Sequence, residues 1–267
     1  ESGASLAVID NPEYALPEGT LLVPNTLLAL QDLARAWRRE LGLPIIGITG
    51  TNGKTTTKEL LATVLSTKYN LHYTQGNLNN QIGVPLTLLQ ITRAHEMAIV
   101  EMGASHPGDI KELVDIAEPN YGLITNVGRA HLEGFGSFEG VQRTKQELYD
   151  YLVAHNGIIF RNADNPYLAE MENQAKQCYI TLHNTTQLYT TGSMPSGTHL
   201  VGEYNAENVS AAICVGRHFG ISCEQALEAI RQYVPTNNRS QAMQTACNQL
   251  IVDAYNANPT SMQAAIN

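Results

Sequence analysis

Residues 49–56, Thr-Gly-Thr-Asn-Gly-Lys-Thr-Thr, form a glycine-rich loop of the kind that holds phosphate groups. An apolar strand, 44–49, precedes the loop, and a helix with an apolar face, 54–68, follows it. Backbone N–H groups of such a loop turn inward, and the helix N-terminus adds partial positive charge. Lys54 could then reach the outer phosphates of a nucleotide, and Thr55 could hold Mg²⁺. The candidate nucleotide-binding residues of the loop are Gly50, Thr51, Asn52, Gly53, Lys54, Thr55 and Thr56. The alternative is a glycine-rich loop that binds nothing.

The glycine spacing departs from the general phosphate-loop pattern G-x-x-x-x-G-K-[ST]. That pattern needs a glycine five residues before Gly53, where this chain has Ile48, and the chain has Gly50 instead. The departure narrows the kind of nucleotide-binding protein that the loop indicates.

Two further predicted strands are followed by side chains that can bind a metal ion. Glu101 ends the apolar run 98–100, and a carboxylate there can bind the Mg²⁺ that bridges nucleotide phosphates. His131 lies just past the predicted strand 122–127, close to Asn126, and a neutral imidazole is a possible metal ligand. Strand ends of a parallel sheet form one edge, where ligands bind. Alternatively, the acid merely follows a strand and the histidine is structural.

Polar residues elsewhere could also contact a ligand. The turn-rich segment 76–85 carries side-chain amides able to hydrogen-bond a polar substrate, at Asn77, Asn79 and Asn80. Asparagine-rich turns usually need no ligand, so this segment is a weak signal alone. Lys145 lies on a predicted helix and, taken by itself, is expected to be a solvated lysine.

Three residues of the C-terminal half could contact a nucleotide. Asn208, which follows Asn205 at the start of a helix, could read an adenine edge. Arg239 could neutralise a phosphate, and Asp253 could accept a ribose hydroxyl. Each residue also has a simpler interpretation: Asn208 as a helix cap, Arg239 as a surface arginine and Asp253 as a turn residue after a strand.

The elements that must position these residues alternate between apolar strands and helices from Pro44 to about Val234, a pattern that predicts a mostly parallel sheet covered on both faces. The predicted strands are 44–49, 97–101, 122–127 and 157–160. The predicted helices are 54–68, 84–90, 108–117, 139–153, 206–218 and 222–233, the last opening on the capping-box pattern of residues 222–225. Residues 184–199, rich in Thr, Ser, Gly and Pro, are predicted to be a loop.

Three regions are predicted along the chain: the tail of a preceding unit over 1–42, a central phosphate-loop domain over 43–234, and the start of a further domain over 235–267. The first ends in a helix with an apolar stripe, and its arginines, Arg35, Arg38 and Arg39, are expected on the solvated side. In the last region a strand at 250–253 leads into a helical pattern. The fold class is therefore α/β.

Composition excludes several classes of function. The chain has 267 residues, of which 43% are hydrophobic and 15% charged, which indicates a globular rather than a disordered protein. A net charge of −9 argues against a nucleic-acid-binding surface. No apolar run is long enough to span a membrane, and no signal-peptide layout opens the chain. The four cysteines, Cys178, Cys214, Cys223 and Cys247, lack the spacing of a metal site. They are expected to be reduced and mostly packed, and a disulfide between two of them remains an alternative.

Together these segments resemble the Mur ligases. The matching strings are TGTNGKTT (49–56), GNLNNQIGVPLTLL (76–89), VEMGASHPGDI (100–110), TNVGRAHLEGFGS (125–137), the lysine of RTKQEL (143–148) and DAYNANPTSM (253–262). They occur in the expected order over most of the chain. The EMGA, AHLEGFGS and DAYNANP strings favour the member of the family that adds D-Ala-D-Ala to UDP-MurNAc-tripeptide. One departure is Tyr204, which stands where the family usually has histidine, and it weakens the expected adenine contact of Asn208.

The resemblance implies an ATP-dependent amide ligase of the bacterial cytoplasm that makes peptidoglycan precursors. ATP would phosphorylate the tripeptide carboxylate, the dipeptide amine would attack the acyl phosphate, and ADP and phosphate would leave. The implied catalytic residues are Lys54, His131 and Lys145. Thr55 and Glu101 would serve one Mg²⁺. His131 would serve a second, together with Lys145 after its reaction with CO₂ to form a carbamate.

The resemblance also implies a chain truncated at both ends, with remnants of an N-terminal UDP-sugar-binding domain and a C-terminal ligase domain, both Rossmann-like. We expect this fragment to be a monomer that binds nucleotide weakly, does not ligate, and has no nucleic-acid or membrane partner. One rival is a folylpolyglutamate synthase-type ligase, against which the DAYNANP string stands. The other is a non-catalytic nucleotide-binding module, against which Glu101, His131 and Lys145 stand.

Overall fold

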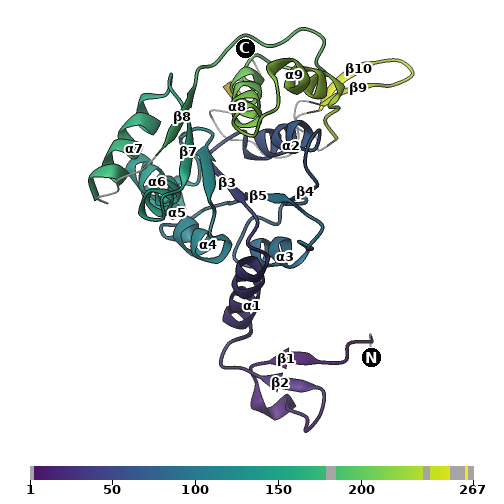
Figure 1. The fold of residues 1–267 in the computed structure, drawn as a ribbon, viewed down its shortest axis with the longest axis vertical. Coiled ribbons are helices and arrows are strands. Elements are labelled where there is room, and N and C mark those ends of the chain that lie inside the picture. The colour runs from purple at the N-terminus through teal and green to yellow at the C-terminus, as the bar shows by residue number, and fades with distance from the viewer. Residues whose placement is uncertain (1–2, 179–184, 237–240, 253–261, 264–267) are drawn as a thin grey trace.

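The computed structural model of this chain describes residues 3–178, 185–236, 241–252 and 262–263. Its main body contains a parallel sheet of six strands in the order β4-β5-β3-β6-β7-β8 (Figure 1). The strands are β3 (Ile45–Thr49), β4 (Leu71–Tyr73), β5 (Met97–Glu101), β6 (Tyr121–Ile124), β7 (Ile158–Asn162) and β8 (Thr186–Tyr189). The predicted α/β class is confirmed.

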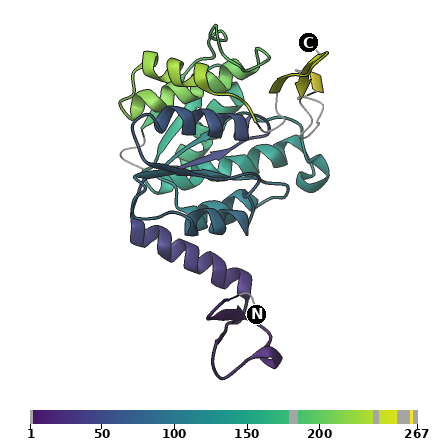
Figure 2. The same cartoon turned by 90° about the vertical axis from the view of Figure 1, so that its right-hand side faces the viewer.

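Helices cover both faces of this sheet (Figure 2). One layer contains α2 (Lys54–Leu65), α8 (Asn205–His218) and α9 (Cys223–Gln232). The other contains α3 (Gly83–Leu89), α4 (Asp109–Ala117), α6 (Phe138–Ala154) and α7 (Pro166–Cys178). Successive strand residues point to opposite faces, so Ile45 packs into the second layer's core and Ile46 into the first layer's core. The predicted capping box at the start of α9 is present, between Ser222 and Gln225.

The chain reverses its direction across the sheet at β3. From β3 it runs through α2 to the edge strand β4, returns with β5 beside β3, and then crosses to β6 on the other side. All five residues of β3 are buried, which fits its continuous apolar sequence. Ligands of such sheets bind beyond the carboxyl ends of the strands at this reversal point, which is where the glycine-rich loop lies.

Short elements differ from the sequence prediction. The prediction of a loop over 184–199 is wrong at its start, where β8 adds an edge strand to β7. The three-residue strand β4 and the helix α7 were not predicted, and β6 ends at Ile124, before the predicted end at 127. Strands of three or four residues are too short to show a period, and pairing with an already formed sheet stabilises them.

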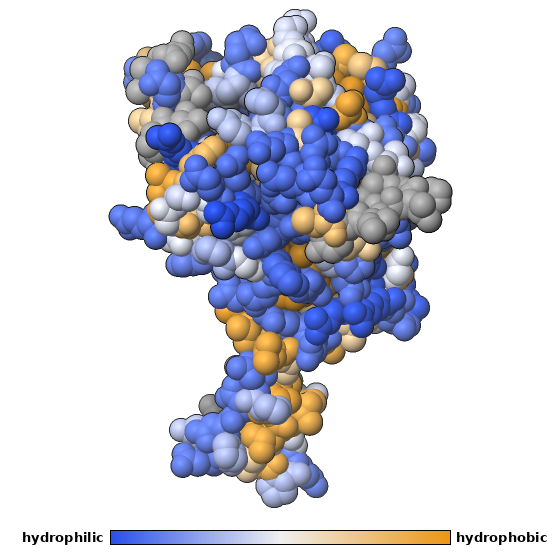
Figure 3. Space-filling view, turned by 90° about the vertical axis from the view of Figure 1, so that its left-hand side faces the viewer, coloured by the Kyte–Doolittle hydropathy of each residue, from blue (hydrophilic) through white to orange (hydrophobic). Residues whose placement is uncertain are grey.

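The N-terminal residues form a small lobe apart from the main body. β1 (Ala7–Ile9) pairs with β2 (Thr20–Leu22), and a 3₁₀ turn (Pro12–Tyr14) lies between them. Several of its large apolar side chains, such as Leu16 and Leu21, are more than half exposed. In the face drawn in Figure 3, apolar residues gather on this lobe whereas polar residues cover most of the main body. Helix α1 (Thr26–Leu41) joins the two parts and contacts α3 and α4. The predicted division of the chain at residues 42 and 234 stays a prediction.

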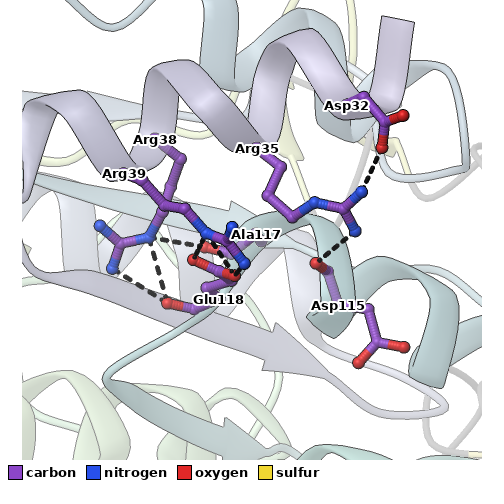
Figure 4. Close-up of polar contacts among 7 residues, drawn as sticks. All are labelled: Asp32, Arg35, Arg38, Arg39, Asp115, Ala117 and Glu118. Atoms are coloured by element: carbon purple, nitrogen blue, oxygen red, sulfur yellow. Dashed lines mark hydrogen bonds and ion pairs between the residues drawn. The ribbon is translucent and has the colours of Figure 1, made fainter. Parts of the chain in front are cut away.

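Arg38 attaches α1 to the main body, and its predicted place on the solvated side is wrong. Its side chain is only 6% exposed. The guanidinium donates hydrogen bonds to the carbonyl oxygens of Ala117 and Glu118 at 3.0–3.2 Å (Figure 4). It also donates to Asn120 Oδ1 at 2.9 Å. Those carbonyls belong to the last residue and the C-cap of α4, where a helix leaves acceptors unpaired, so a cation there is stabilising. Arg39 pairs with the Glu118 carboxylate at the surface.

Replacing Arg38 with methionine should therefore destabilise the chain. The variant keeps the apolar stem and leaves the carbonyl acceptors of Ala117 and Glu118 unpaired, so the free energy of unfolding should fall by about 2–4 kcal/mol in urea titrations. Arg39→Met is the matched control, because a surface ion pair contributes at most about 1 kcal/mol. Equal effects of the two variants would contradict this account of Arg38.

The C-terminal described residues form a hairpin of β9 (Gln241–Gln244) and β10 (Gln249–Val252). β10 confirms the strand predicted at 250–253 as far as the described residues extend. No helix in the described ranges is long and apolar enough to cross a membrane. All four cysteines are free, and three are exposed, so the prediction of mostly packed thiols is wrong: Cys178, Cys223 and Cys247 are exposed and Cys214 is partly buried.

Candidate nucleotide and metal site

The glycine-rich loop leads directly from β3 into α2. Gly50 has φ 147° and Gly53 has φ 78°, conformations that side chains disfavour. A Cβ on Gly50 would lie 1.9 Å from Thr125 Oγ1, and one on Gly53 would lie 2.6 Å from Asn208 Oδ1. Both glycines are therefore required by close packing as well as by backbone conformation. The N–H groups of residues 53–56 lie in the first turn of α2, where a helix offers no internal acceptor, so they can bind an anion.

Residues after β6 clamp this loop. Thr51 N–H donates to the Asn126 carbonyl and Asn52 N–H donates to Asn126 Oδ1, both at 3.0 Å. Thr125 Oγ1 donates to the Asn52 carbonyl at 2.6 Å, and Gly128 N–H donates to Thr51 Oγ1 at 2.9 Å. The sequence prediction included Asn126 only as a neighbour of His131 and missed its contacts with the loop. No local pattern in the sequence indicates its role, because β6 lies beside β3 only in the folded sheet.

Lys54 lies folded back over the loop. Its Nζ donates to the carbonyl oxygens of Gly50 at 2.8 Å and Thr51 at 3.1 Å. The ammonium therefore lies at the mouth of the loop, where it can meet a phosphate group. This position agrees with the predicted phosphate contact, which stays a prediction.

Thr55 and Glu101, the predicted ligands of one metal ion, lie in contact. Glu101 is the last residue of β5 and pairs with Ile48 of β3, so its side chain is presented beside the start of α2. Thr55 Oγ1 donates to Glu101 Oε1 at 3.2 Å. Glu101 Oε2 is buried and accepts no hydrogen bond among the described residues. A hydroxyl and a carboxylate oxygen that accepts no hydrogen bond, beside a phosphate loop, are oxygen ligands that fit Mg²⁺.

His131 and Lys145, the predicted ligands of a second metal ion, approach the same phenyl ring. His131 precedes the short helix α5 (Leu132–Phe135), with its ring centroid 6.4 Å from that of Phe135. Lys145 lies on α6 with its Nζ 5.8 Å from the Phe135 ring centroid. The described residues contain no group of three or more His, Cys, Asp or Glu side chains able to hold a metal ion. A second site here would need an additional acidic group.

Lys145 is 3% exposed, so the expectation of a solvated lysine is wrong. Burial, together with the positive charge of Lys54, lowers the pKa of its ammonium to about 7, against smaller opposite effects of Asp109 and Glu147. A lysine whose pKa lies near neutrality is a nucleophile and a proton acceptor at physiological pH.

This pKa predicts how stability depends on pH. The folded-state pKa of Lys145, about 7, lies below that of an unfolded lysine, 10.5, so between these values the unfolded chain binds more protons. Stability therefore rises with pH in this window and is lost as the pH falls toward 7. In CO₂-free buffer, the free energy of unfolding of the wild type relative to Lys145→Met should increase by about 2 kcal/mol from pH 7 to pH 9. A pH-independent difference in urea titrations would contradict the lowered pKa.

The three asparagines of segment 76–85 have different surroundings. Asn79 Nδ2 donates to Glu101 Oε1 at 2.9 Å, so this amide contacts a predicted metal ligand. Asn80 Oδ1 accepts the N–H groups of Ile82 and Gly83, at the start of α3. Asn77 is exposed. The predicted substrate contact of these residues stays a prediction, and Asn80 has a structural role as well.

Asn208 lies against the loop at the start of α2. Its Oδ1 accepts a hydrogen bond from Thr57 Oγ1 at 3.0 Å, and its Nδ2 donates to Asn205 Oδ1 at 3.0 Å. The residue therefore lies near the candidate phosphate loop, although its amide is engaged in these contacts. Arg239 and Asp253, the other predicted nucleotide contacts, lie outside the described residues.

Comparison with known proteins gives a consistent result. The model of the Mur ligase middle domain matches residues 48–187. UDP-N-acetylmuramoyl-tripeptide–D-alanyl-D-alanine ligase of Bacillus subtilis is 38% identical over 283 residues, which cover 100% of this chain and 62% of that protein. The crystal structure of MurF from Acinetobacter baumannii has a TM-score of 0.86 and 32% identity, covering 97% of this chain and 61% of that one. MurF from Thermotoga maritima, solved in complex with ADP, has a TM-score of 0.84 and 26% identity, covering 99% and 65%. The chain thus spans less than two thirds of the length of these relatives.

Proposed function

The chain belongs to the Mur ligase family, and from that premise we propose that it supplies the ATP-binding part of a ligase that adds D-Ala-D-Ala to UDP-MurNAc-tripeptide in peptidoglycan precursor synthesis. The observation that carries the proposal is the contact between Thr55 of the phosphate loop and the buried Glu101 of the neighbouring strand. A phosphate loop joined to a metal-binding carboxylate is what transfer of a phosphoryl group requires. The proposal includes a monomeric protein of the bacterial cytoplasm that acts on small molecules.

The reaction brings two anions together, and the residues of this chain reduce their repulsion. The first turn of α2 and Lys54 would hold the phosphates of ATP, while the tripeptide carboxylate attacks the γ-phosphorus and ADP leaves. The amine of D-Ala-D-Ala would then attack the acyl phosphate and release phosphate. Mg²⁺, when bound, neutralises the charge on the phosphate oxygens. Thr55 and Glu101 would hold one such ion, and His131 would belong to a second.

Lys145 would complete the second metal site as a carbamate. Its lowered pKa leaves roughly half of the amine neutral at pH 7, whereas an ordinary lysine is almost wholly protonated there. The neutral nitrogen would form a bond to the carbon of CO₂ and release one proton, giving an anionic carbamate. This modification would supply the acidic group that the surroundings of His131 need, and it would relieve the repulsion between Lys145 and Lys54.

Trapping of the acyl phosphate tests the proposed function. The full-length protein with ATP and UDP-MurNAc-tripeptide, but without D-Ala-D-Ala, should form a hydroxamate of the tripeptide when hydroxylamine is added. Substitution of a folate for the tripeptide should give none, which separates the proposal from a folylpolyglutamate synthase-type ligase. A non-catalytic nucleotide-binding module would bind ATP and form no hydroxamate with either substrate.

A further inference from the structure

Lys58, on the helix that follows the phosphate loop, has no part in the reaction described above. Its side chain is completely buried, and its ammonium forms no hydrogen bond with the described residues. Two carboxylates face it, Glu59 with Oε1 at 3.2 Å and Glu101 with Oε2 at 3.8 Å. The ring of Tyr73 lies on another side, with its centroid 5.7 Å from Nζ. A buried ammonium is unfavourable unless such groups compensate its charge, so the surroundings are organised around Lys58.

The two oxygens of Glu101 have different partners. Oε1 accepts hydrogen bonds from Thr55 Oγ1 at 3.2 Å and Asn79 Nδ2 at 2.9 Å. Oε2 is buried, accepts no hydrogen bond from the described residues, and is the oxygen that pairs with Lys58. A buried oxygen without a donor requires an explanation, and a metal ligand is one. Lys58 therefore lies against the oxygen that is open to a metal ion.

We infer that Lys58 is a positioning residue that holds Oε2 of Glu101 in the metal-free protein and yields this oxygen when Mg²⁺ binds with the nucleotide. The inference rests on the proposed binding of Mg²⁺ at Thr55 and Glu101. An ammonium and a divalent cation that share one carboxylate repel each other, so they compete for it. The ammonium of Lys58 then pairs with Glu59 alone. The Glu59 carboxylate is the nearer of its two partners and is 24% exposed. Lys58 thus sets how tightly the metal ion binds.

Binding of Mn²⁺ to the 267-residue chain with saturating ADP, measured from the electron paramagnetic resonance signal of free Mn²⁺, tests this role. Lys58→Met removes the competing charge and keeps an apolar side chain of similar length, so the Kd for Mn²⁺ should fall about tenfold. Glu59→Gln removes the alternative partner of Lys58, so the Kd should rise about threefold. Lys68→Met is the matched control, because this exposed lysine bonds to the Phe219 carbonyl and should leave the Kd unchanged.

A purely structural lysine predicts a different pattern. Lys58→Met would then lower the melting temperature and leave the Kd for Mn²⁺ as in the wild type, which would overturn the inference; weaker Mn²⁺ binding by this variant would overturn it too. If Lys58→Met does not fold, Glu59→Gln decides alone, and an unchanged Kd refutes the role of Lys58. A wild-type chain that binds ADP without Mn²⁺ refutes the proposed metal site and this inference together. Normal wild-type binding with unchanged variants refutes only the inference.

Discussion

Replacing Lys54 with methionine should reduce the affinity of the 267-residue chain for ATP by up to about a hundredfold, because a hydrogen bond to a charged group contributes about 1.5–3 kcal/mol and this ammonium lies at the mouth of the loop with a donor left for a phosphate. The variant keeps the apolar stem of the side chain and the glycines of the loop. Isothermal titration calorimetry with ATP and Mg²⁺ measures the effect.

Lys111→Met is the control for the loss of a positive charge, since Lys111 is an exposed lysine on α4 paired with Asp115. This control should bind ATP as the wild type does. Thermal unfolding of both variants checks the fold, because Lys54 also donates to the loop carbonyls of Gly50 and Thr51. An unchanged ATP affinity in a folded Lys54→Met variant would mean that the loop does not bind phosphate through this lysine.

Replacing Lys145 with methionine should lower phosphate release by the full-length protein at least about a thousandfold. The reason is that the second metal ion, which would stabilise the transferred phosphoryl group, would lose the carbamate that binds it. Added formate or acetate should restore part of the activity, since a small carboxylate can occupy the space of the missing carbamate. In wild-type protein equilibrated with ¹³C-bicarbonate, the carbamate carbon should give a nuclear magnetic resonance signal that is absent from the variant.

Lys176→Met is the matched control, because Lys176 forms a structural ion pair with Glu172 on α7. It should keep both the carbamate signal and the phosphate release. Loss of activity in Lys145→Met without rescue by carboxylates, together with no carbamate signal in the wild type, would refute the carbamate and leave Lys145 as a buried amine beside Lys54.

The elements that could be predicted from sequence are those in which the local pattern and the fold agree. Residues 45–49 and 97–101 are continuous apolar runs followed by polar groups, and both are buried central strands. Thr55 and Glu101 could be placed at one site because parallel neighbouring strands end at the same edge. Their contact follows from that arrangement alone.

Other contacts could not be predicted, because distant parts of the chain decide them. Arg38 has the sequence setting of a surface arginine and becomes buried because the end of α4 offers it carbonyl acceptors. Lys145 has the setting of a solvated lysine on a helix, and α5 with Phe135 covers it. The same holds for Asn126, whose hydrogen bonds hold a loop more than seventy residues away in the sequence. A single sequence contains no local signal for such contacts.

The central claim is that residues of this chain hold ATP for the formation of an acyl phosphate. Release of phosphate from ATP by the full-length protein, followed with a coupled assay, tests it most directly. We predict release only when UDP-MurNAc-tripeptide and D-Ala-D-Ala are both present, and loss of that release in Lys54→Met. Release that is independent of either substrate, or that persists in Lys54→Met, would contradict the claim.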